Sequence, residues 1–131
     1  MSTSYGFEKH LPHTRIDQAI ETVTAALKQE GFGILSRIDV QETLKIKLNV
    51  DFRPYVILGA CNPQLAHRAL CVEPQIGLLL PCNVVVQAAG DGVDISIADP
   101  TAMFAIVDTP ALTSVAEDAA ARLRRALEAM E

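Results

Sequence analysis

Apolar residues recur every three or four positions along two stretches of the chain, and this spacing predicts two amphipathic helices. The first begins after Thr14, which can cap it, and ends at Gly31, a residue type that commonly stops helices. The second begins at Thr109-Pro110 and continues to about residue 130. The apolar stripes consist of Ile16, Ala19, Ile20, Val23 and Leu27 in the first helix, and Leu112, Val115, Ala119, Leu123, Leu127 and Met130 in the second.

Shorter apolar runs predict strands at residues 5–10, 32–38, 55–60, 82–88 and 93–97. Residues 77–80 are predicted as a further piece of strand, divided from the next by Pro81. Gly90-Asp91-Gly92 predicts a hairpin turn, because glycine adopts positive φ freely. Apolar and polar residues alternate in the strand after this turn, as in an antiparallel strand with one exposed face.

Three shorter helices are predicted from residues that favour helix starts. Asp39 can cap one that continues to Leu48, Asn62-Pro63 begins a second, and Asp99-Pro100 begins a third. Strands therefore occur both separated by helices and joined in a hairpin. This mixture predicts an α+β fold with helices packed on one face of a mixed or antiparallel sheet. No linker or low-complexity tract divides the chain, so residues 1–131 are predicted to form a single domain.

Composition narrows the functions that such a domain can have. The 131 residues are 50% hydrophobic and carry 11 basic and 16 acidic side chains, a net charge of −5. Nucleic-acid-binding domains usually carry a basic stripe, so the acidic balance argues against nucleic acid and against an anionic membrane surface as partners. No apolar run is long enough to span a bilayer, and the first ten residues lack a signal-peptide pattern. We therefore expect a cytoplasmic protein.

The residues that could carry chemistry concentrate around three cysteines. Cys61, Cys71 and Cys82 are an odd number, which favours free thiols over a disulfide framework. Cys61 lies where a buried strand is predicted to end and the helix capped by Asn62 to begin, and free backbone N–H groups at such a point can lower a thiol pKa. His67 lies in the same helix. If the strands at Cys61 and Cys82 are neighbours, these two cysteines and His67 could converge.

Three interpretations of these residues remain open. In the first, the cysteines are small buried hydrophobic residues, and Asn62 and Asn83 are caps or turn formers. In the second, the thiols and His67 form a metal or small-ligand site, and Cys71 could share a helical face with His67. No two cysteines have the Cys-x-x-Cys spacing of a zinc site. In the third, one thiolate is a nucleophile or redox centre with His67 as its base.

Other polar groups carry less information. Asp51 and Arg53 are interpreted as a solvated loop pair, and His10 and His13 as parts of an exposed turn with no third metal ligand nearby. Arginines at 122–125 are interleaved with acidic residues and are expected to face solvent. The sequence has no phosphate-binding loop, dinucleotide fingerprint, nucleophile elbow or zinc-protease motif.

Several of these segments together resemble a known family. Residues 59–63 (GACNP), His67, residues 77–86 (GLLLPCNVVV) and Asp99-Pro100 resemble the bacterial and archaeal "domain of unknown function 302" family over about residues 5–103. The resemblance implies a β-α-β-rich, TATA-box-binding-protein-like α+β fold and a homodimer, but no assigned reaction. Function depends on the site, so this fold label does not imply DNA binding. The positions that match the family motif are Cys61, Asn62, His67, Cys82 and Asn83.

These observations lead to one leading hypothesis and two alternatives. The leading hypothesis is a cytoplasmic homodimer that binds a small ligand or metal in a pocket lined by Cys61, Asn62, His67, Cys82 and Asn83. A metal ion would be held by Cys61, His67 and Cys82. The first alternative is a thiol-dependent enzyme or redox carrier that uses Cys61 or Cys82 with His67. The second is a structural or protein-interaction module in which both Cys-Asn pairs serve the fold.

Overall fold

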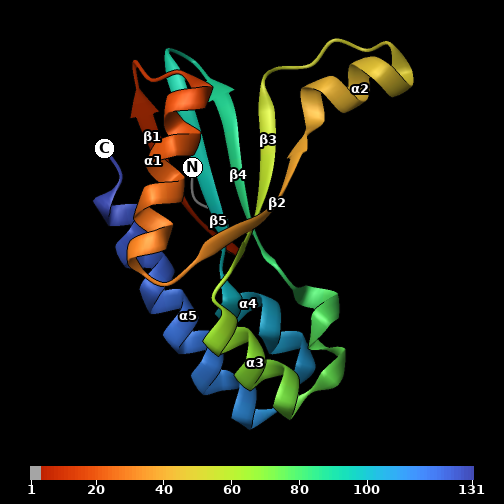
Figure 1. Ribbon diagram of the computed structural model, residues 1–131, viewed down its shortest axis with the longest axis vertical. Helices are drawn as coiled ribbons and strands as arrows, with labels where there is room; N and C mark the ends of the chain where they lie inside the picture. The colour runs from red at the N-terminus through yellow and green to blue at the C-terminus, as the bar shows by residue number, and fades with distance from the viewer. Residues whose placement is uncertain (1–3) are drawn as a thin grey trace.

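The computed structural model describes residues 4–131, and its centre is a five-stranded sheet with the strand order β1-β5-β4-β3-β2 (Figure 1). All four neighbouring strand pairs are antiparallel. The α+β prediction is therefore confirmed, in its antiparallel form. The elements are β1 Gly6–Pro12, α1 Ile16–Gln29, β2 Gly33–Asp39, α2 Val40–Leu48, β3 Tyr55–Cys61, α3 Pro63–Val72, η1 Pro74–Leu79, β4 Cys82–Ala89, β5 Gly92–Ala98, α4 Pro100–Phe104, η2 Ala105–Val107 and α5 Pro110–Ala129.

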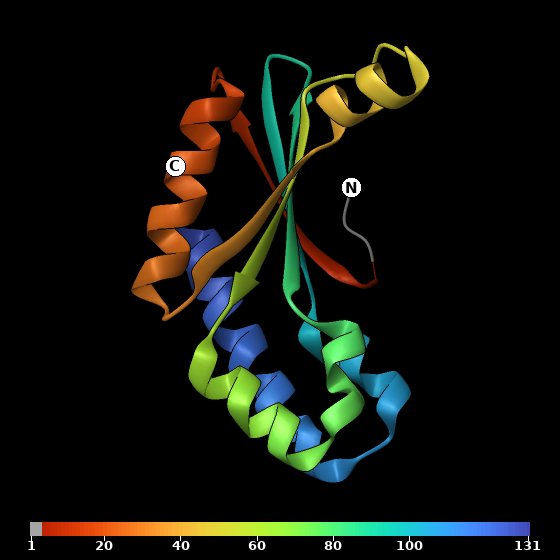
Figure 2. The same ribbon diagram turned by 45° about the vertical axis from the view of Figure 1, so that its right-hand side comes forward.

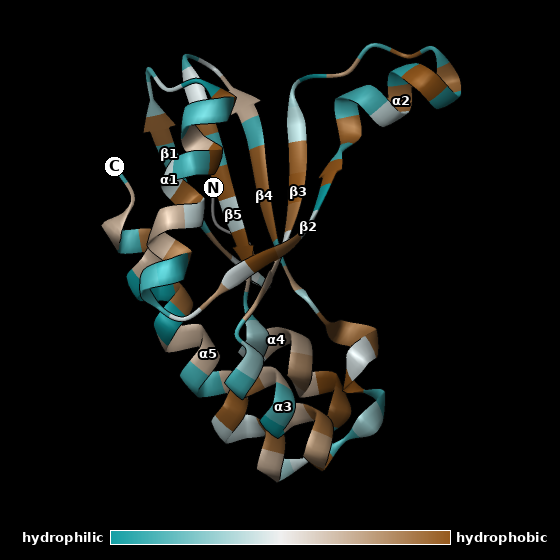
Figure 3. Ribbon diagram, viewed as in Figure 1, coloured by the Kyte–Doolittle hydropathy of each residue, from teal (hydrophilic) through white to brown (hydrophobic). Residues whose placement is uncertain are grey.

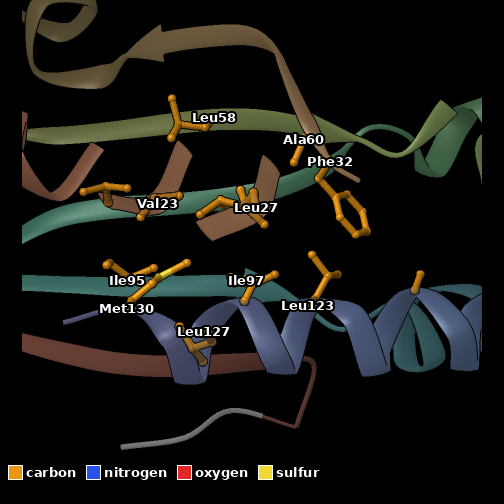
Figure 4. Close-up of a cluster of buried hydrophobic side chains, with 14 of the residues drawn as sticks. Val23, Leu27, Phe32, Leu58, Ala60, Ile95, Ile97, Leu123, Leu127 and Met130 are labelled. Atoms are coloured by element: carbon orange, nitrogen blue, oxygen red, sulfur yellow. The ribbon is translucent and has the colours of Figure 1, made fainter. Parts of the chain in front are cut away.

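Helices α1 and α5 lie on one face of this sheet (Figures 1 and 2). Their apolar stripes are the two predicted from sequence, and they pack against the strand residues that point toward the helices. Full burial of a side chain such as Leu123 stabilises the fold by roughly 1.5–3 kcal/mol. Figure 4 shows part of this core, including Val23, Leu27, Phe32, Leu58, Ala60, Ile95, Ile97, Leu123, Leu127 and Met130.

The last turn of α5 is held by β1. Lys9 Nζ donates to the carbonyl oxygens of Leu127 and Met130 at 3.0 and 2.5 Å, where a cation interacts favourably with the helix dipole. The guanidinium of Arg124 lies 4.7 Å from the ring centroid of Phe7 on the same strand. Although α5 is the longest described helix, neither it nor any other helix of residues 4–131 is apolar enough over a sufficient length to cross a membrane.

A second group of short helices closes one end of the sheet. α3, η1 and α4 lie there beside the first half of α5 (Figure 1). Asn62 caps α3 and Asp99 caps α4, each followed by proline at the first helical turn, as predicted. Ile76 and Phe104 are buried in this group and fix η1 and α4 against the core.

Two local predictions are wrong. Residues 77–80 are not a strand, because Glu73 caps a 3₁₀ helix through its side chain, which accepts from the Gln75 N–H at 2.8 Å, and Pro74 begins that helix. The cap of α1 is Arg15 rather than Thr14. The Thr14 hydroxyl instead donates to the Pro12 carbonyl at 2.9 Å, within the turn that leaves β1.

The other face of the sheet, called the open face below, is covered by no helix within residues 4–131 (Figure 2). Helix α2 projects from the end of the sheet opposite α3 and α4 (Figure 1). None of its residues Val40–Leu48 is buried, although the predicted helix and its cap Asp39 are both present. The open face and the projecting helix are therefore the two large surfaces that the core does not use.

Candidate functional site

The open face is built from rows of residues that run across the strands. One row joins Glu8, Ser96, Val85, Ile57 and Ile38 through consecutive pairings from β1 to β2. Because side chains alternate along a strand, these residues share the face that points away from α1 and α5. The row is polar at the β1 edge and apolar toward β2.

The adjoining row consists of small side chains, which leave room above the sheet. Gly6 pairs with Ala98 between β1 and β5, and Asn83 pairs with Gly59 between β4 and β3. A Cβ atom on Gly59 would lie 2.8 Å from the Pro81 Cγ, so glycine permits the close approach of Pro81 here. Gly59 itself is buried beneath Ser36 and Pro81, whereas Gly6, Ala98 and Asn83 of the same row line a hollow.

Two adjoining hollows lie over this row, and we call them together the surface groove. They measure about 250 and 390 Å³ and share Asn83, Ala98 and Met103. After the side chains that line them, we call the smaller hollow, against η1 and α4, the apolar end, and the larger hollow, over β1, β5, β4 and β3, the polar end, although backbone groups make the exposed lining of the smaller hollow the more polar of the two. The apolar end is lined also by Leu78, Leu79, Leu80, Pro81, Cys82, Pro100 and Phe104, and the polar end by Tyr5, Gly6, Glu8, Tyr55, Val85, Gln87, Ser96 and Ile97.

Cys82 connects the surface groove to a small interior space. Besides lining the apolar end, it lines an inner hollow of about 30 Å³ beneath Leu80 and Phe104. Cys61 and Asn62 line the same inner hollow. Its volume is enough for about one water-sized probe, and its walls are almost wholly apolar. The inner hollow therefore holds no small molecule without movement of its walls.

The two thiols of the inner hollow are protonated at neutral pH. Burial raises the pKa of Cys82 to about 11, and the nearby Cys61 raises it further. Burial also raises the pKa of Cys61 above the usual value for a cysteine. The Cys61 pKa is therefore raised, not lowered as expected from the helix start, and the cause is burial of the thiol.

The two asparagines have different surroundings. Asn62 is only 8% exposed, and its side-chain oxygen accepts from the Leu65 N–H at 3.2 Å to cap α3. Its side-chain nitrogen donates to the Glu30 carbonyl oxygen at 3.4 Å, just past the end of α1. Asn83 is exposed and lines both parts of the surface groove. Asn62 thus serves the fold, whereas Asn83 faces a space that a ligand can reach.

His67 does not join the cysteines. It is exposed on α3 and lines neither the surface groove nor the inner hollow. Cys71, four residues further along the helix, is exposed as well. Within residues 4–131, no group of three or more His, Cys, Asp or Glu side chains could hold a metal ion. The predicted metal set of Cys61, His67 and Cys82 therefore finds no support in this geometry.

The hairpin end of the sheet contains a polar cluster whose contacts the sequence did not predict. His10 is part of β1, where its Nδ1 lies 2.7 Å from Asp94 Oδ1 and its Nε2 lies 3.1 Å from Asp91 Oδ1. These carboxylates raise the His10 pKa above 6.5, and His10 in turn lowers the pKa of Asp91. The exposed-turn prediction is correct for His13 and wrong for His10.

The structure also shows the two other groups of charged residues singled out in the sequence, Asp51 with Arg53 and the arginines at 122–125. Asp51 forms an ion pair with Lys45 at 3.1 Å rather than with Arg53. The guanidinium of Arg53 stacks on the ring of Phe52, 4.5 Å from its centroid. In the arginine run at 122–125, Arg122 forms an ion pair with Asp118, one turn earlier in α5, at 2.8 Å. None of these exposed pairs lies in the surface groove, so we assign them to the surface of the fold.

The polar end of the groove could not be found from the sequence. Tyr5, Glu8, Tyr55, Gln87 and Ser96 come from four strands or their ends and lie far apart along the chain. Because side chains alternate between the two faces of a strand, the sequence can indicate which residues of one strand share a face. Only the strand order and register bring them together, and neither can be read from the individual strands.

The strand order, the two-helix layer on one face and the groove on the other define a small α+β sheet domain with one open face. The chain belongs to the family described as "Domain of unknown function DUF302", whose model matches residues 7–130. The match continues past the predicted limit at residue 103 and includes α5.

A solved structure of the same family has the same architecture. The crystal structure of an uncharacterised conserved DUF302 protein from Bacillus stearothermophilus is 35% identical in sequence, with a TM-score of 0.90. The alignment covers 98% of this chain and 100% of that one. No curated protein matches the chain. The comparisons therefore establish the family and the fold, while the likeness to the TATA-box-binding protein stays a prediction.

Proposed function

We propose that this protein binds a small amphipathic molecule non-covalently in the surface groove, with Cys82 and Asn83 at the apolar end. The observation that carries the proposal is the pair of adjoining hollows, about 250 and 390 Å³, on a sheet face that no described helix covers. Volumes of this size are typical of small-molecule sites. This proposal keeps Cys82 and Asn83 from the predicted site and assigns Asn62 and His67 no contact with the ligand.

The two ends of the groove favour a ligand with two different parts. Leu78 is 83% exposed at the apolar end, where Met103 and Leu80 also line the hollow. Covering such surface gains about 25 cal/mol per Å² removed from water. The hydroxyl and amide groups at the polar end would instead hydrogen-bond the ligand and fix its orientation. The side chains of the groove therefore suit a ligand that has both apolar and polar groups.

Reversible binding fits the chemistry of the site better than covalent catalysis. A thiol with a pKa of about 11 is almost wholly protonated at neutral pH, so Cys82 is a poor nucleophile. His67 is exposed on α3 and lines neither hollow, and cannot act as a base for either thiol without rearrangement. We propose that Cys82 acts as a polarisable apolar wall. Because three cysteines favour a reducing compartment, we include a cytoplasmic location in the proposal.

Filling the groove tests the proposal. Ala98 lines both hollows, so the substitution Ala98→Phe should occupy the space where they join. The neutral fluorescent probe N-phenyl-1-naphthylamine should bind the unaltered protein, and Ala98→Phe should weaken this binding about tenfold or more. The matched control is Ala121→Phe on the exposed side of α5, which should bind as the unaltered protein does. Equal binding by both variants would contradict the proposal.

We also propose that the protein is a homodimer that associates through α2. The supporting observation is that none of residues Val40–Leu48 is buried, while Ile46 and Leu48 are 70% and 65% exposed. Figure 3 shows hydrophobic stretches on this projecting helix. An isolated nine-residue helix is marginal in water, so a partner surface would stabilise it. The hollow beside α2 shares no lining residue with the surface groove.

A further inference from the structure

We infer that Cys61 and Cys82 form a reversible disulfide when the protein meets a peroxide, and that this bond joins the end of β3 to the start of β4. Cys61 is the last residue of β3, and Cys82 is the first of β4. The inference goes beyond the proposed function, because it requires no ligand in the surface groove. It depends on the sheet register at these two residues, on the inner hollow that both of them line, and on their partial burial.

The sheet register brings the two cysteines within reach of a disulfide. Ala60 pairs with Cys82 across β3 and β4, and Cys61 is the next residue along β3. Paired Cα atoms of antiparallel strands lie about 4.5–5.5 Å apart, and one step along a strand adds about 3.4 Å at right angles to that. We therefore expect the Cα atoms of Cys61 and Cys82 to lie about 6 Å apart, which is within the range of about 4.4–6.8 Å that disulfides span.

Both cysteines line the same space although they are not directly paired. In a regular strand, Cys61 would point to the opposite face from Ala60 and Cys82. However, β3 ends at Cys61, and the next residue, Asn62, already caps α3. Beside this change of direction, Cys61 and Cys82 both line the inner hollow. The charge of Cys61 also contributes to the raised pKa of Cys82, so the two thiols interact. We therefore expect rotation of the two side chains to bring the sulfur atoms into bonding distance.

Partial burial leaves both thiols open to a small oxidant. Cys61 and Cys82 are each half-buried, and Cys82 also lines the apolar end of the surface groove. Among the described residues, no charged side chain lines the inner hollow, so no cation there stabilises a thiolate and oxidation should be slow. The product suits this site, because a disulfide carries no charge and the walls of the inner hollow are almost wholly apolar.

The oxidation takes two steps, with hydrogen peroxide as the oxidant. Cys61 attacks first, because its pKa is the less strongly raised of the two. Its sulfur bonds one peroxide oxygen, the O–O bond breaks, and the leaving hydroxide takes the thiol proton to give water and a sulfenic acid. The Cys82 sulfur then attacks the sulfenic sulfur and forms the S–S bond, and the displaced hydroxide leaves as a second water with the Cys82 proton. Two thiols and one peroxide thus give one disulfide and two waters, and thiol reductants reverse the bond.

Peptide mapping of the oxidised protein tests the inference. Folded protein with the substitution Cys71→Ser would be treated with a small excess of hydrogen peroxide, its remaining thiols blocked with N-ethylmaleimide in urea, and the chain digested with trypsin. Trypsin cleaves after Arg68, which lies between Cys61 and Cys82, so only a disulfide can keep the two peptides together. We expect a joined pair of peptides that dithiothreitol separates.

The unaltered protein provides the same test without a variant. Cys71 is exposed and does not line the inner hollow, so we expect it to join neither of the other cysteines. Adding chymotrypsin, which cleaves after leucine, cuts at Leu78 and Leu79 and so separates Cys71 from Cys82. The joined peptides should then contain Cys61 and Cys82 and not Cys71.

The melting temperature tests whether the bond also stabilises the fold. The disulfide would close a loop that contains α3 and η1, and such closure restricts the unfolded chain. The oxidised Cys71→Ser protein should therefore melt about 5–10 °C higher than the same protein after dithiothreitol. The matched control adds Cys82→Ser, which leaves a single thiol and should show no rise. Reversal by dithiothreitol in the Cys71→Ser protein makes the same comparison if this control fails to fold.

Three results would overturn the inference. The first is separate peptides after peroxide treatment, with each thiol unchanged or oxidised singly. The second is a disulfide through Cys71, or one that forms only when the protein is oxidised in urea. The third is a joined protein that melts no higher than the reduced one, which would show that the bond does not stabilise the junction of β3 and β4. None of these results concerns ligand binding, which Ala98→Phe tests separately.

Discussion

Asn62 is the residue on which the position of α3 depends most directly. Its oxygen caps α3 through the Leu65 N–H, and its nitrogen bonds the Glu30 carbonyl at the end of α1. We expect Asn62→Ala to lower the free energy of unfolding by about 1–2 kcal/mol, because it removes a helix cap and leaves buried polar groups without partners. Urea unfolding followed by circular dichroism measures this difference.

The two bonds of Asn62 can be separated by a conservative change. Asn62→Asp keeps an oxygen that accepts from the Leu65 N–H but loses the donor to Glu30. It should therefore be less destabilised than Asn62→Ala, since aspartate caps helices about as well as asparagine. Equal stability of Asn62→Ala and the unaltered protein would show that neither bond matters for folding.

Cys82 provides a test of thiol chemistry at the same scale. Because burial raises its pKa to about 11, its alkylation by iodoacetamide should be slow at pH 7.5 and should rise steeply only above pH 10. The exposed Cys71 should react first and serves as the internal control. Mass spectrometry of peptides from a pH series measures both rates. A midpoint for Cys82 near 8.5, the usual value for cysteine, would favour the thiol-enzyme alternative instead.

Residue types alone could not decide between the interpretations of the Cys-Asn pairs. The helix-capping role of Asn62 was predictable, because asparagine followed by proline is a strong helix start. The burial of Cys61 and Cys82 was not, since it depends on α3, α4 and α5 packing over the strand ends. Burial and helix N-termini change a thiol pKa in opposite directions, so its direction requires the tertiary structure.

At the scale of elements, the sequence was informative where periodicity was long. The stripes of α1 and α5 and the alternation in β5 were predicted because many positions repeat the same pattern. The strand predicted at residues 77–80 was wrong because a glycine followed by three leucines fits a strand or a short helix equally well. The deciding contact is the Glu73 cap, a local hydrogen bond that hydrophobic pattern does not reveal.

Helix α2 illustrates a different limit. Its cap at Asp39 and its length were predicted, yet its apolar residues do not face the core of this chain. Hydrophobic spacing predicts that a helix has an apolar face, but not which molecule covers that face. The register of the sheet could not be predicted from the sequence either. It pairs Glu8 with Ser96 and Tyr55 with Gln87, and so brings together the polar end of the groove from residues far apart along the chain.

At the scale of the whole molecule, the proposed dimer must bury enough surface to be stable. A typical stable interface buries about 800 Å² on each partner, roughly one tenth of the 7681 Å² exposed by this chain. A nine-residue helix is only about 13 Å long, so α2 must be joined by neighbouring surface. Ile38 and Val50, which are 50% and 45% exposed on either side of α2, extend the apolar surface.

The charges of α2 favour an antiparallel arrangement of two copies. Glu42 lies in the first turn of the helix, and Lys45 and Lys47 lie in the last. A twofold axis perpendicular to the helix places the first turn of one helix against the last turn of its copy, so opposite charges face each other and the helix dipoles oppose. The same surface then complements itself, as an interface between identical subunits requires.

The prediction is that Ile46→Glu converts a dimer into a monomer. A carboxylate at the centre of the α2 surface would be buried without a partner in the dimer and remain solvated in the monomer. Sedimentation equilibrium should give twice 14.1 kDa for the unaltered protein and 14.1 kDa for this variant. The control is Ile106→Glu, because Ile106 is 77% exposed in η2, far along the chain from α2, and lines none of the hollows described above. A monomeric unaltered protein, or equal dissociation by both variants, would remove α2 as the dimer interface.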